Sequence, residues 1–224
     1  MKIIAMLSFY DEDPALVAAC IASVTEVGAT HLVAVDGAYR LFPDGRPVSA
    51  WRTIDAVSSC TSVGLGLLLY SPTVTWINNE VGKRSVMLGL AMAIAEPGDW
   101  LMVVDSDYIF ERYVNLHDLL SRVDEDVVEV GFYDARHPDG LPLIYEASLI
   151  MRAVPGLRMG DNHYTYISPS GRENTILRAG GGDAASYDAT DTILVRHDVH
   201  QRDPERRARQ TKYYEQRDQL GIEK

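Results

Sequence analysis

The order of apolar runs at the start of the chain constrains its fold most strongly. The opening run, KIIAMLSFY, is mostly apolar and contains β-branched residues, which is typical of a buried strand. DPALVAACIASVTEVG predicts a helix, because Asp13 can cap its start, Pro14 suits its first turn and Gly28 suits its end. A second apolar run, HLVAVDG, carries Asp36 near its end. A strand, a helix and a strand in this order predict a parallel sheet of the α/β class.

The apolar pattern continues along the first half of the chain. We expect a helix in TIDAVSSCTSVGLG and a third strand in TVTWI, at residues 73–77. A further helix is expected over residues 80–96, and a fourth strand in WLMVV, at residues 100–104. Strands and helices therefore alternate over this half, as in a Rossmann-like sheet.

The second half of the chain has a mixed pattern. VVEVGFYDA, LIYEASLIM, HYTYIS and TILVRHD predict strands, HDLLSRV predicts a short helix, and a last helix is expected to begin at Pro204. We therefore expect one α/β domain with a single mixed, mostly parallel sheet. It would consist of a Rossmann-like half at residues 1–110, a mixed half at residues 111–202 and a C-terminal helix at residues 203–224.

Aromatic and acidic residues follow directly after the predicted strands. Phe9, Tyr10 and Glu12 stand at the end of the first strand, Asp36 at the end of the second, and Asp105 at the end of the fourth. In an open parallel sheet, ligands bind beyond the carboxyl ends of the strands. The predicted topology therefore brings these residues together at one ligand site.

Asp105 and Asp107 stand one residue apart in VVDSDYI. Where the chain turns at the end of a strand, both carboxylates can reach one cation, which would relieve their mutual repulsion. Mg²⁺ and Mn²⁺ take oxygen ligands, often one or two carboxylates together with substrate phosphates. Asp and Ser also favour turns, so the same residues fit a simple turn. After a buried strand in an α/β chain, the pair predicts a divalent metal site.

Other phosphate-binding motifs are incomplete. The haloacid-dehalogenase phosphatases carry their Asp motif on the first strand, whereas VVDSDYI lies on about the fourth. NNEVGKRS does not complete a phosphate-binding loop, because Ile77 stands where its first glycine would be. A sugar-phosphate nucleotidyltransferase would need a Gly-rich loop with Arg and Lys after the first strand, and SFYDEDP has none.

The charge and cysteine content restrict the partners and the compartment. A formal net charge of −11 over 224 residues disfavours a broad nucleic-acid-binding surface. Cys20 and Cys60 form no CxxC motif and predict neither a disulfide scaffold nor a zinc site. MKIIAMLSFYDED lacks the pattern of a signal peptide, and no run approaches the roughly 20 apolar residues of a membrane span. These features favour a cytoplasmic protein without a membrane span.

The order and spacing of the segments resemble the nucleotide-sugar glycosyltransferases of the large inverting family with the A-type fold, family two. FYDED after the first strand, AVDG after the second, NNEVGKRS at a helix start, GDWLMVVDSD, and RHD before a basic helix carry the resemblance. It implies a UDP- or GDP-linked sugar as donor, Mn²⁺ or Mg²⁺ as cofactor and an acceptor hydroxyl of unknown identity. The first half would bind the donor and the second half the acceptor, with nucleic acid open only as an acceptor.

The resemblance also assigns residues to the donor. Phe9, Tyr10 and Glu12 would border the nucleoside, with Tyr10 near the base. Asp36 would accept a hydrogen bond from the base or the ribose. Lys83, near a helix start, would face the diphosphate together with its neighbour Arg84.

The metal would lie between the donor and the end of the fourth strand. Its ligands, in the picture that the resemblance implies, are Asp105, Asp107 and His197, with Ser106 also touching the donor. His200 lies in the same VRHDVHQRD segment and competes with His197 for this role.

The acceptor hydroxyl needs a general base. Members of the family often carry a His-Glu pair in an aromatic-rich segment, and RMGDNHYTY is the nearest match here. His163 fits the pattern, but Tyr164 replaces the glutamate, and tyrosine is a poor base near neutral pH. Asp161 or His163 would then serve as the base, although this segment also fits an ordinary turn.

Two segments and two functions stay open. GGGDAAS is either a loop that closes over the substrates or a solvent loop. The helix DPERRARQTKYYEQRD carries Arg206, Arg207 and Arg209, which either bind an acidic acceptor, fix that loop or face solvent. Besides a sugar transferase, the sequence allows another nucleotide-sugar-using enzyme, such as a nucleotidyltransferase, and a non-catalytic binding module.

Overall fold

The computed structural model describes residues 1–77, 80–134, 145–161, 165–171, 173–175, 186–198 and 202–221. The helices are α1 (Pro14–Val27), α2 (Trp51–Ser58), the 3-10 helix η1 (Ser59–Val63), α3 (Glu80–Ile94), α4 (Leu116–Leu120) and α5 (Pro204–Gln219). The strands are β1 (Ile3–Ser8), β2 (His31–Val35), β3 (Gly66–Tyr70), β4 (Trp100–Asp105), β5 (Tyr108–Arg112), β6 (Val127–Asp134), β7 (Tyr145–Arg152), β8 (Arg158–Met159), β9 (Thr165–Ile167), β10 (Glu173–Thr175), β11 (Tyr187–Asp188) and β12 (Leu194–His197).

One large sheet organises the molecule. Its strands follow the order β3-β2-β1-β4-β7-β6-β12-β5, and β11 pairs with β6. The strands β3, β2, β1 and β4 are parallel to one another, whereas β7 is antiparallel to both of its neighbours and β5 is antiparallel to β12. The mixed, mostly parallel sheet expected from the sequence is confirmed, but it is not the single sheet that was predicted. A second, smaller sheet consists of β10, β9 and β8.

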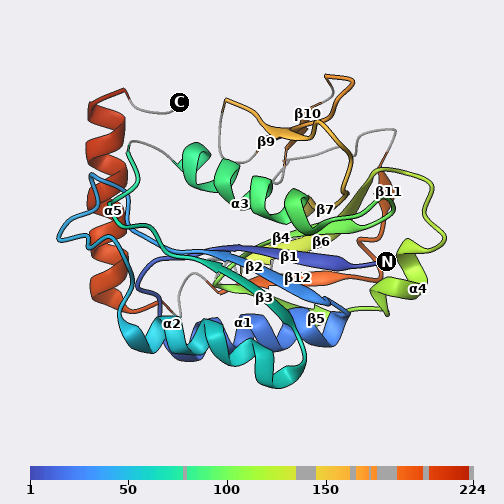
Figure 1. Cartoon of the computed structure of the whole chain (residues 1–224), viewed down its shortest axis with the longest axis horizontal. Coiled ribbons are helices and arrows are strands. Elements are labelled where there is room, and N and C mark those ends of the chain that lie inside the picture. The colour runs from blue at the N-terminus through green and yellow to red at the C-terminus, as the bar shows by residue number, and fades with distance from the viewer. Residues whose placement is uncertain are drawn as a thin grey trace.

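The helices cover both faces of the large sheet. Figure 1 shows α1 and α2 on one face and α3 on the other. The caps of α1 are those that the sequence predicts: Asp13 accepts a hydrogen bond from the backbone N–H of Ala15, and Gly28 adopts a φ of 116°, which favours glycine. β1 and β4 run through the centre of the sheet, and the side chains from Trp100 to Val104 are almost entirely buried. Within the described residues, none of the helices is long and apolar enough to cross a membrane.

The third strand predicted at residues 73–77 is wrong. The strand beside β2 is β3, which pairs His31–Val35 with Gly66–Tyr70 in parallel register. Residues 73–77 contribute only an isolated bridge from Trp76 to Tyr39, and Ile77 is exposed. The β-branched residues of TVTWI suggested a strand. The edge strand is instead GLLLY, which begins two residues after Gly64 ends the preceding helix.

The last helix stands across the end of the sheet where β1 and β4 finish (Figure 1). Its start at Pro204 is as predicted, because the side chain of Asp203 accepts a hydrogen bond from the backbone N–H of Arg206. Tyr213 of α5 is buried and stacks on Tyr39, with ring centroids 5.2 Å apart. The helix therefore closes one side of the region beyond the carboxyl ends of the strands.

Candidate functional site

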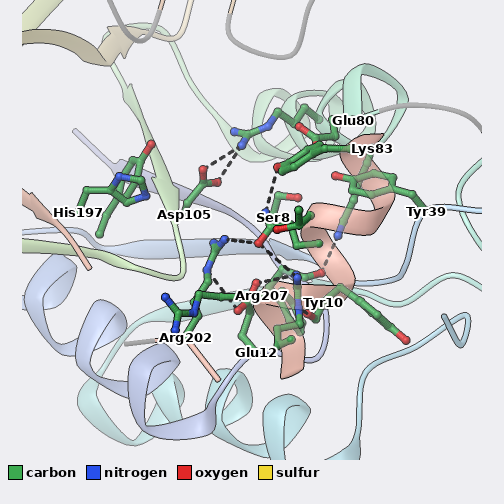
Figure 2. A pocket seen from close by; sticks show the side chains of 17 residues that line it. Ser8, Tyr10, Glu12, Tyr39, Glu80, Lys83, Asp105, His197, Arg202 and Arg207 are labelled. Carbon is green, nitrogen blue, oxygen red and sulfur yellow. Dashed lines mark hydrogen bonds and ion pairs between the residues drawn. The ribbon is translucent and has the colours of Figure 1, made fainter. Parts of the chain in front are cut away.

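A cleft of about 360 Å³ lies beyond the carboxyl ends of β1 and β4, beside α3 and α5. Figure 2 shows Asp105 and His197 on one side of this cleft, Tyr39 on the other, and Glu12 and Arg202 below them. The cleft is lined by Ser8, Phe9, Tyr10, Glu12, Tyr39, Glu80, Lys83, Arg84, Asp105, Tyr108, His197, Arg202, Arg206, Arg207, Gln210, Thr211 and Tyr214. The site therefore lies where ligands bind other open parallel sheets.

Most residues that the sequence assigned to the donor and the metal meet in this cleft. Those that line it are Phe9, Tyr10, Glu12, Lys83, Arg84, Asp105 and His197. Ser106 and Asp107 follow Asp105 directly and are buried, with exposed fractions of 1% and 0%. The structure thus brings seven of the predicted residues to one cavity from four separate parts of the chain.

Among the described residues, four of the predicted ones do not line the cleft, namely Asp36, Ser106, Asp107 and Asp161. Asp36 is buried, and its carboxylate accepts hydrogen bonds from the backbone N–H (2.8 Å) and the hydroxyl (2.5 Å) of Ser49. It thereby fixes the loop after β2. Asp161 is exposed on the turn after β8, and His163 lies outside the described residues, as does His200. The role of Asp161 or His163 as general base stays a prediction.

Asp105 is held by a charged partner. Nη2 of Arg84, on α3, donates to both of its carboxylate oxygens at 2.8 and 3.1 Å. Burial disfavours the charged guanidinium, but Asp105, together with weaker contributions from Tyr166, Glu80 and Tyr39, outweighs this effect and keeps the pKa of Arg84 well above its usual range. The first carboxylate of the pair is therefore neutralised by the protein itself, and Arg84 is oriented at the cleft wall.

Asp107 meets His197 because of an unexpected strand. β5 follows the Asp pair directly and is antiparallel to β12, with Tyr108 opposite His197. The backbone N–H of Asp198 also donates to the carbonyl of Asp107 at 2.7 Å. As a result, Nε2 of His197 lies 3.1 Å from a carboxylate oxygen of Asp107. The sequence named both residues, but the strand that joins them was missed.

The environment favours the charged forms of both groups. Burial alone would raise the pKa of Asp107, but Arg202 and His197 stabilise the carboxylate and its pKa lies below its usual range. Burial likewise opposes the imidazolium of His197, but the nearby carboxylates of Asp107 and Asp105 together outweigh it, so the pKa of His197 is raised.

These two shifts predict a pH window for the stability of the pair. The contribution of His197 is complete below its ordinary pKa of 6.5 and is lost as the pH rises through its higher folded pKa. The contribution of Asp107 is complete above its ordinary pKa of 3.8 and is lost as the pH falls through its lower folded pKa. We expect His197→Gln to lower the free energy of unfolding by about 1 kcal/mol inside this window, and by less above it.

Urea unfolding of wild type and His197→Gln at several pH values measures this difference. His117→Gln, a substitution on α4 outside the cleft, serves as the control and should give a small difference at every pH. A wild-type advantage over His197→Gln that does not shrink as the pH rises would show that the charged pair does not form.

Lys83 lines the cleft but is also bound to the backbone. Its Nζ donates to the carbonyls of Phe9 (2.5 Å) and Gly37 (2.9 Å), which are the residues just beyond β1 and β2. It also lies 5.4 Å from the ring centroid of Tyr39. Burial lowers the pKa of Lys83 to about 7, against the opposing charge of Asp36. Lys83 therefore joins the two strand-end loops that border the cleft.

Arginines from the C-terminal segment supply a second wall, which sequence reasoning left undecided. Arg206 donates to a carboxylate oxygen of Glu12 (2.9 Å) and to the carbonyl of Tyr10 (3.1 Å). Arg202 lies within 3.5 Å of Glu12 and 3.2 Å of Asp107. The acidic run FYDED and the basic run DPERRAR have complementary charge. That complementarity was a signal, but the sequence alone does not say that the two runs meet.

The fit of this site to a divalent cation depends on Asp107 and His197. The carboxylate of Asp107 is fully buried and neither oxygen has a hydrogen-bond partner. One carboxylate and one imidazole nitrogen are ligands that Mn²⁺ accepts, and phosphate oxygens or water can complete its shell. Among the described residues there is no group of three or more His, Cys, Asp or Glu side chains that could hold a metal ion. The pair therefore fits a cation that takes two ligands from Asp107 and His197 and its remaining ligands from a bound phosphate.

Comparison with known proteins gives a partial similarity of fold. No family model and no curated protein matches the chain. A crystal structure of S. aureus TarS 1–349, a glycosyltransferase, is 16% identical with a TM-score of 0.44, and the match covers 68% of this chain and 47% of that one. A second S. aureus TarS structure is 16% identical with a TM-score of 0.45, covering 68% and 28%. This chain thus spans less than half of the length of either TarS structure.

Proposed function

We propose that this protein transfers a sugar from a nucleoside-diphosphate sugar to an acceptor hydroxyl, with a divalent metal at Asp107 and His197. The observation that carries the proposal is the charge of the cleft. Five basic side chains line it, namely Lys83, Arg84, Arg202, Arg206 and Arg207, against the carboxylates Glu12, Glu80 and Asp105. In a chain with a net charge of −11, five of the 21 Lys and Arg residues line this one cavity, which suits an anionic ligand.

The shape of the lining supports a nucleotide as that anion. Tyr10, Tyr39 and Tyr214 border the cleft on the side of the loops after β1 and β2. Aromatic rings provide flat apolar faces for a base, and the phosphates would then lie toward Arg84, Arg202 and Arg207. A diphosphate placed there would also reach the pair formed by Asp107 and His197.

Sugar transfer places new negative charge on the leaving diphosphate. Arg84 and Arg207 stand at the cleft wall to stabilise that charge more strongly in the transition state than in the ground state. When bound, a divalent ion held by Asp107 and His197 would act as a Lewis acid on the phosphate oxygens. We propose an inverting reaction, in which Asp161 or His163 takes the proton of the acceptor hydroxyl.

Thermal melting with a panel of nucleoside-diphosphate sugars, with and without Mn²⁺, tests this function. A donor at a concentration about 100 times its dissociation constant should stabilise the folded protein by about 2.7 kcal/mol. The panel should include UDP- and GDP-linked sugars together with matched nucleoside monophosphates, which lack the second phosphate and should shift the melt less.

The outcomes separate the competing functions. A donor that shifts the melt only with Mn²⁺, and that is consumed when candidate acceptors are added, supports the transferase. A donor that binds but is never consumed with any acceptor favours the non-catalytic binding module. If no donor shifts the melt in either condition, nucleotide-sugar transfer is wrong.

A further inference from the structure

We propose that Arg202 is a displaceable counter-ion of Asp107. Arg202 pairs with the carboxylate until a divalent cation replaces it, and the freed Arg202 then binds the diphosphate. The inference rests on the proposed function, since it presumes a metal and a diphosphate in the same cleft. Arg202 lies just before α5, and its side chain is 10% exposed at the cleft wall. Among the described residues, Arg202 is the arginine that lies within ion-pair distance of Asp107, at 3.2 Å.

Arg202 is close to two carboxylates without being hydrogen-bonded to either. Its Nη2 lies 3.2 Å from Asp107 and its Nε lies 3.5 Å from Glu12. Nevertheless, Nε of Arg202, both oxygens of Asp107 and Oε2 of Glu12 are buried atoms without a hydrogen-bond partner. The hydrogen bond that fixes Arg202 is the one from Nη1 to the side chain of Gln210, at 2.9 Å. Charge, and not hydrogen-bond geometry, therefore holds Arg202 beside the two acids.

The other arginines of the cleft that pair with acids are bound differently. Arg84 donates to both oxygens of Asp105 at 2.8 and 3.1 Å. Arg206 donates to Glu12 at 2.9 Å and to a backbone carbonyl. Displacing either residue would break direct charge-assisted hydrogen bonds, which are the stronger kind. Displacing Arg202 from Asp107 would break none, so Arg202 is the cation that can leave.

Electrostatics explains why a cation is needed there at all. Asp107 is fully buried, and a buried carboxylate without a positive partner is strongly unfavourable. A divalent ion at Asp107 and His197 would meet that need and would repel the guanidinium. Arg202 could then turn into the cleft, where its planar fork suits a phosphate. Arg207 lines the same wall, and its buried Nε has no hydrogen-bond partner. Its guanidinium could therefore bind the same phosphate.

Two direct binding measurements test the exchange. Mn²⁺ binding, followed by the electron paramagnetic resonance signal of the free ion without phosphate, should be about tenfold tighter in Arg202→Gln, because the competing charge is gone. Pyrophosphate binding, followed by calorimetry, should be about tenfold weaker in the same variant at saturating Mn²⁺, and should change little in EDTA, where Arg202 still pairs with Asp107. Arg207→Gln is the matched control: it should weaken pyrophosphate binding and leave the Mn²⁺ affinity unchanged.

A second measurement avoids removing the charge, in case Arg202→Gln does not fold. In ¹⁵N-labelled wild type, the Nε resonance of Arg202, assigned by its loss in Arg202→Lys, should move when Mg²⁺ is added without phosphate. An Arg202 resonance that ignores Mg²⁺, or a folded Arg202→Gln whose Mn²⁺ affinity is unchanged or weaker, overturns the proposal. These results are distinct from failure of the proposed function, because a protein that binds no donor can still show the exchange at Arg202.

Discussion

Asp107→Asn is expected to weaken Mn²⁺ binding by at least about 100-fold, since even groups that only support a metal ligand change affinity by 10- to 100-fold. The substitution preserves the shape of the side chain but removes the negative charge. Asp105 and Asp107 differ in their partners, because Asp105 is already hydrogen-bonded to Arg84, whereas both oxygens of Asp107 lack hydrogen bonds. The Mn²⁺-dependent part of the donor-induced melting shift should disappear with it.

Asp105→Asn provides the matched comparison. It makes the same chemical change two residues away, yet the amide oxygen can still accept from Arg84. We therefore expect the Mn²⁺ concentration that gives half of the melting shift to stay near the wild-type value, although donor binding itself weakens. Equal loss of Mn²⁺ binding in the two variants would mean that the two carboxylates bind the ion jointly, and unchanged binding in Asp107→Asn would place the metal elsewhere.

Local signals in the sequence were enough to predict the class of fold. Asp13, Pro14 and Gly28 mark the ends of α1, and Asp203 marks the start of α5, because caps act within a few residues of the chain. The buried runs of β1, β2 and β4 are apolar on both sides, as parallel central strands must be. The rules for how strands and helices connect leave few possible topologies, so the parallel arrangement of these strands could be predicted.

The edges of the sheet were harder to predict. Because β3 is half-exposed, the apolar periodicity of GLLLY does not distinguish a strand from the end of a helix. TVTWI matched the composition of a strand better. β5 follows β4 after the two-residue turn of Ser106 and Asp107, and it was not expected as a strand. Edge strands take their place from the partner that they meet, and that partner can be far along the chain, as β12 is for β5.

The candidate site shows the same division between local and long-range information. The end of β4 could be predicted, and so could the Asp pair, because both lie in one segment. The cations that face the pair come from α3 and from the segment before α5, about 20 and 95 residues away. From the sequence Arg206 could bind an acidic acceptor, fix a loop or face solvent, and in the structure it is buried against Glu12. Only the fold shows that an acidic loop and a basic helix neutralise each other.

Lys83→Met is expected to lower the free energy of unfolding by about 3 kcal/mol, which corresponds to a decrease of roughly 10 °C in melting temperature for a chain of this size. The substitution keeps the apolar stem and the volume of the side chain. It leaves the carbonyls of Phe9 and Gly37 without their donor inside the protein, and each unsatisfied buried group is unfavourable by about 1–3 kcal/mol. It also removes the cation from the face of Tyr39.

Lys212→Met separates this effect from the general loss of a lysine. Lys212 lies exposed on α5, so its replacement should change stability by less than about 0.5 kcal/mol. If Lys83 were chiefly a phosphate ligand, as the sequence suggested, Lys83→Met would melt like Lys212→Met and would lose only donor binding. A large melting difference before any ligand is added would instead identify Lys83 as the residue that holds the loops after β1 and β2 in place, with the cleft depending on it indirectly.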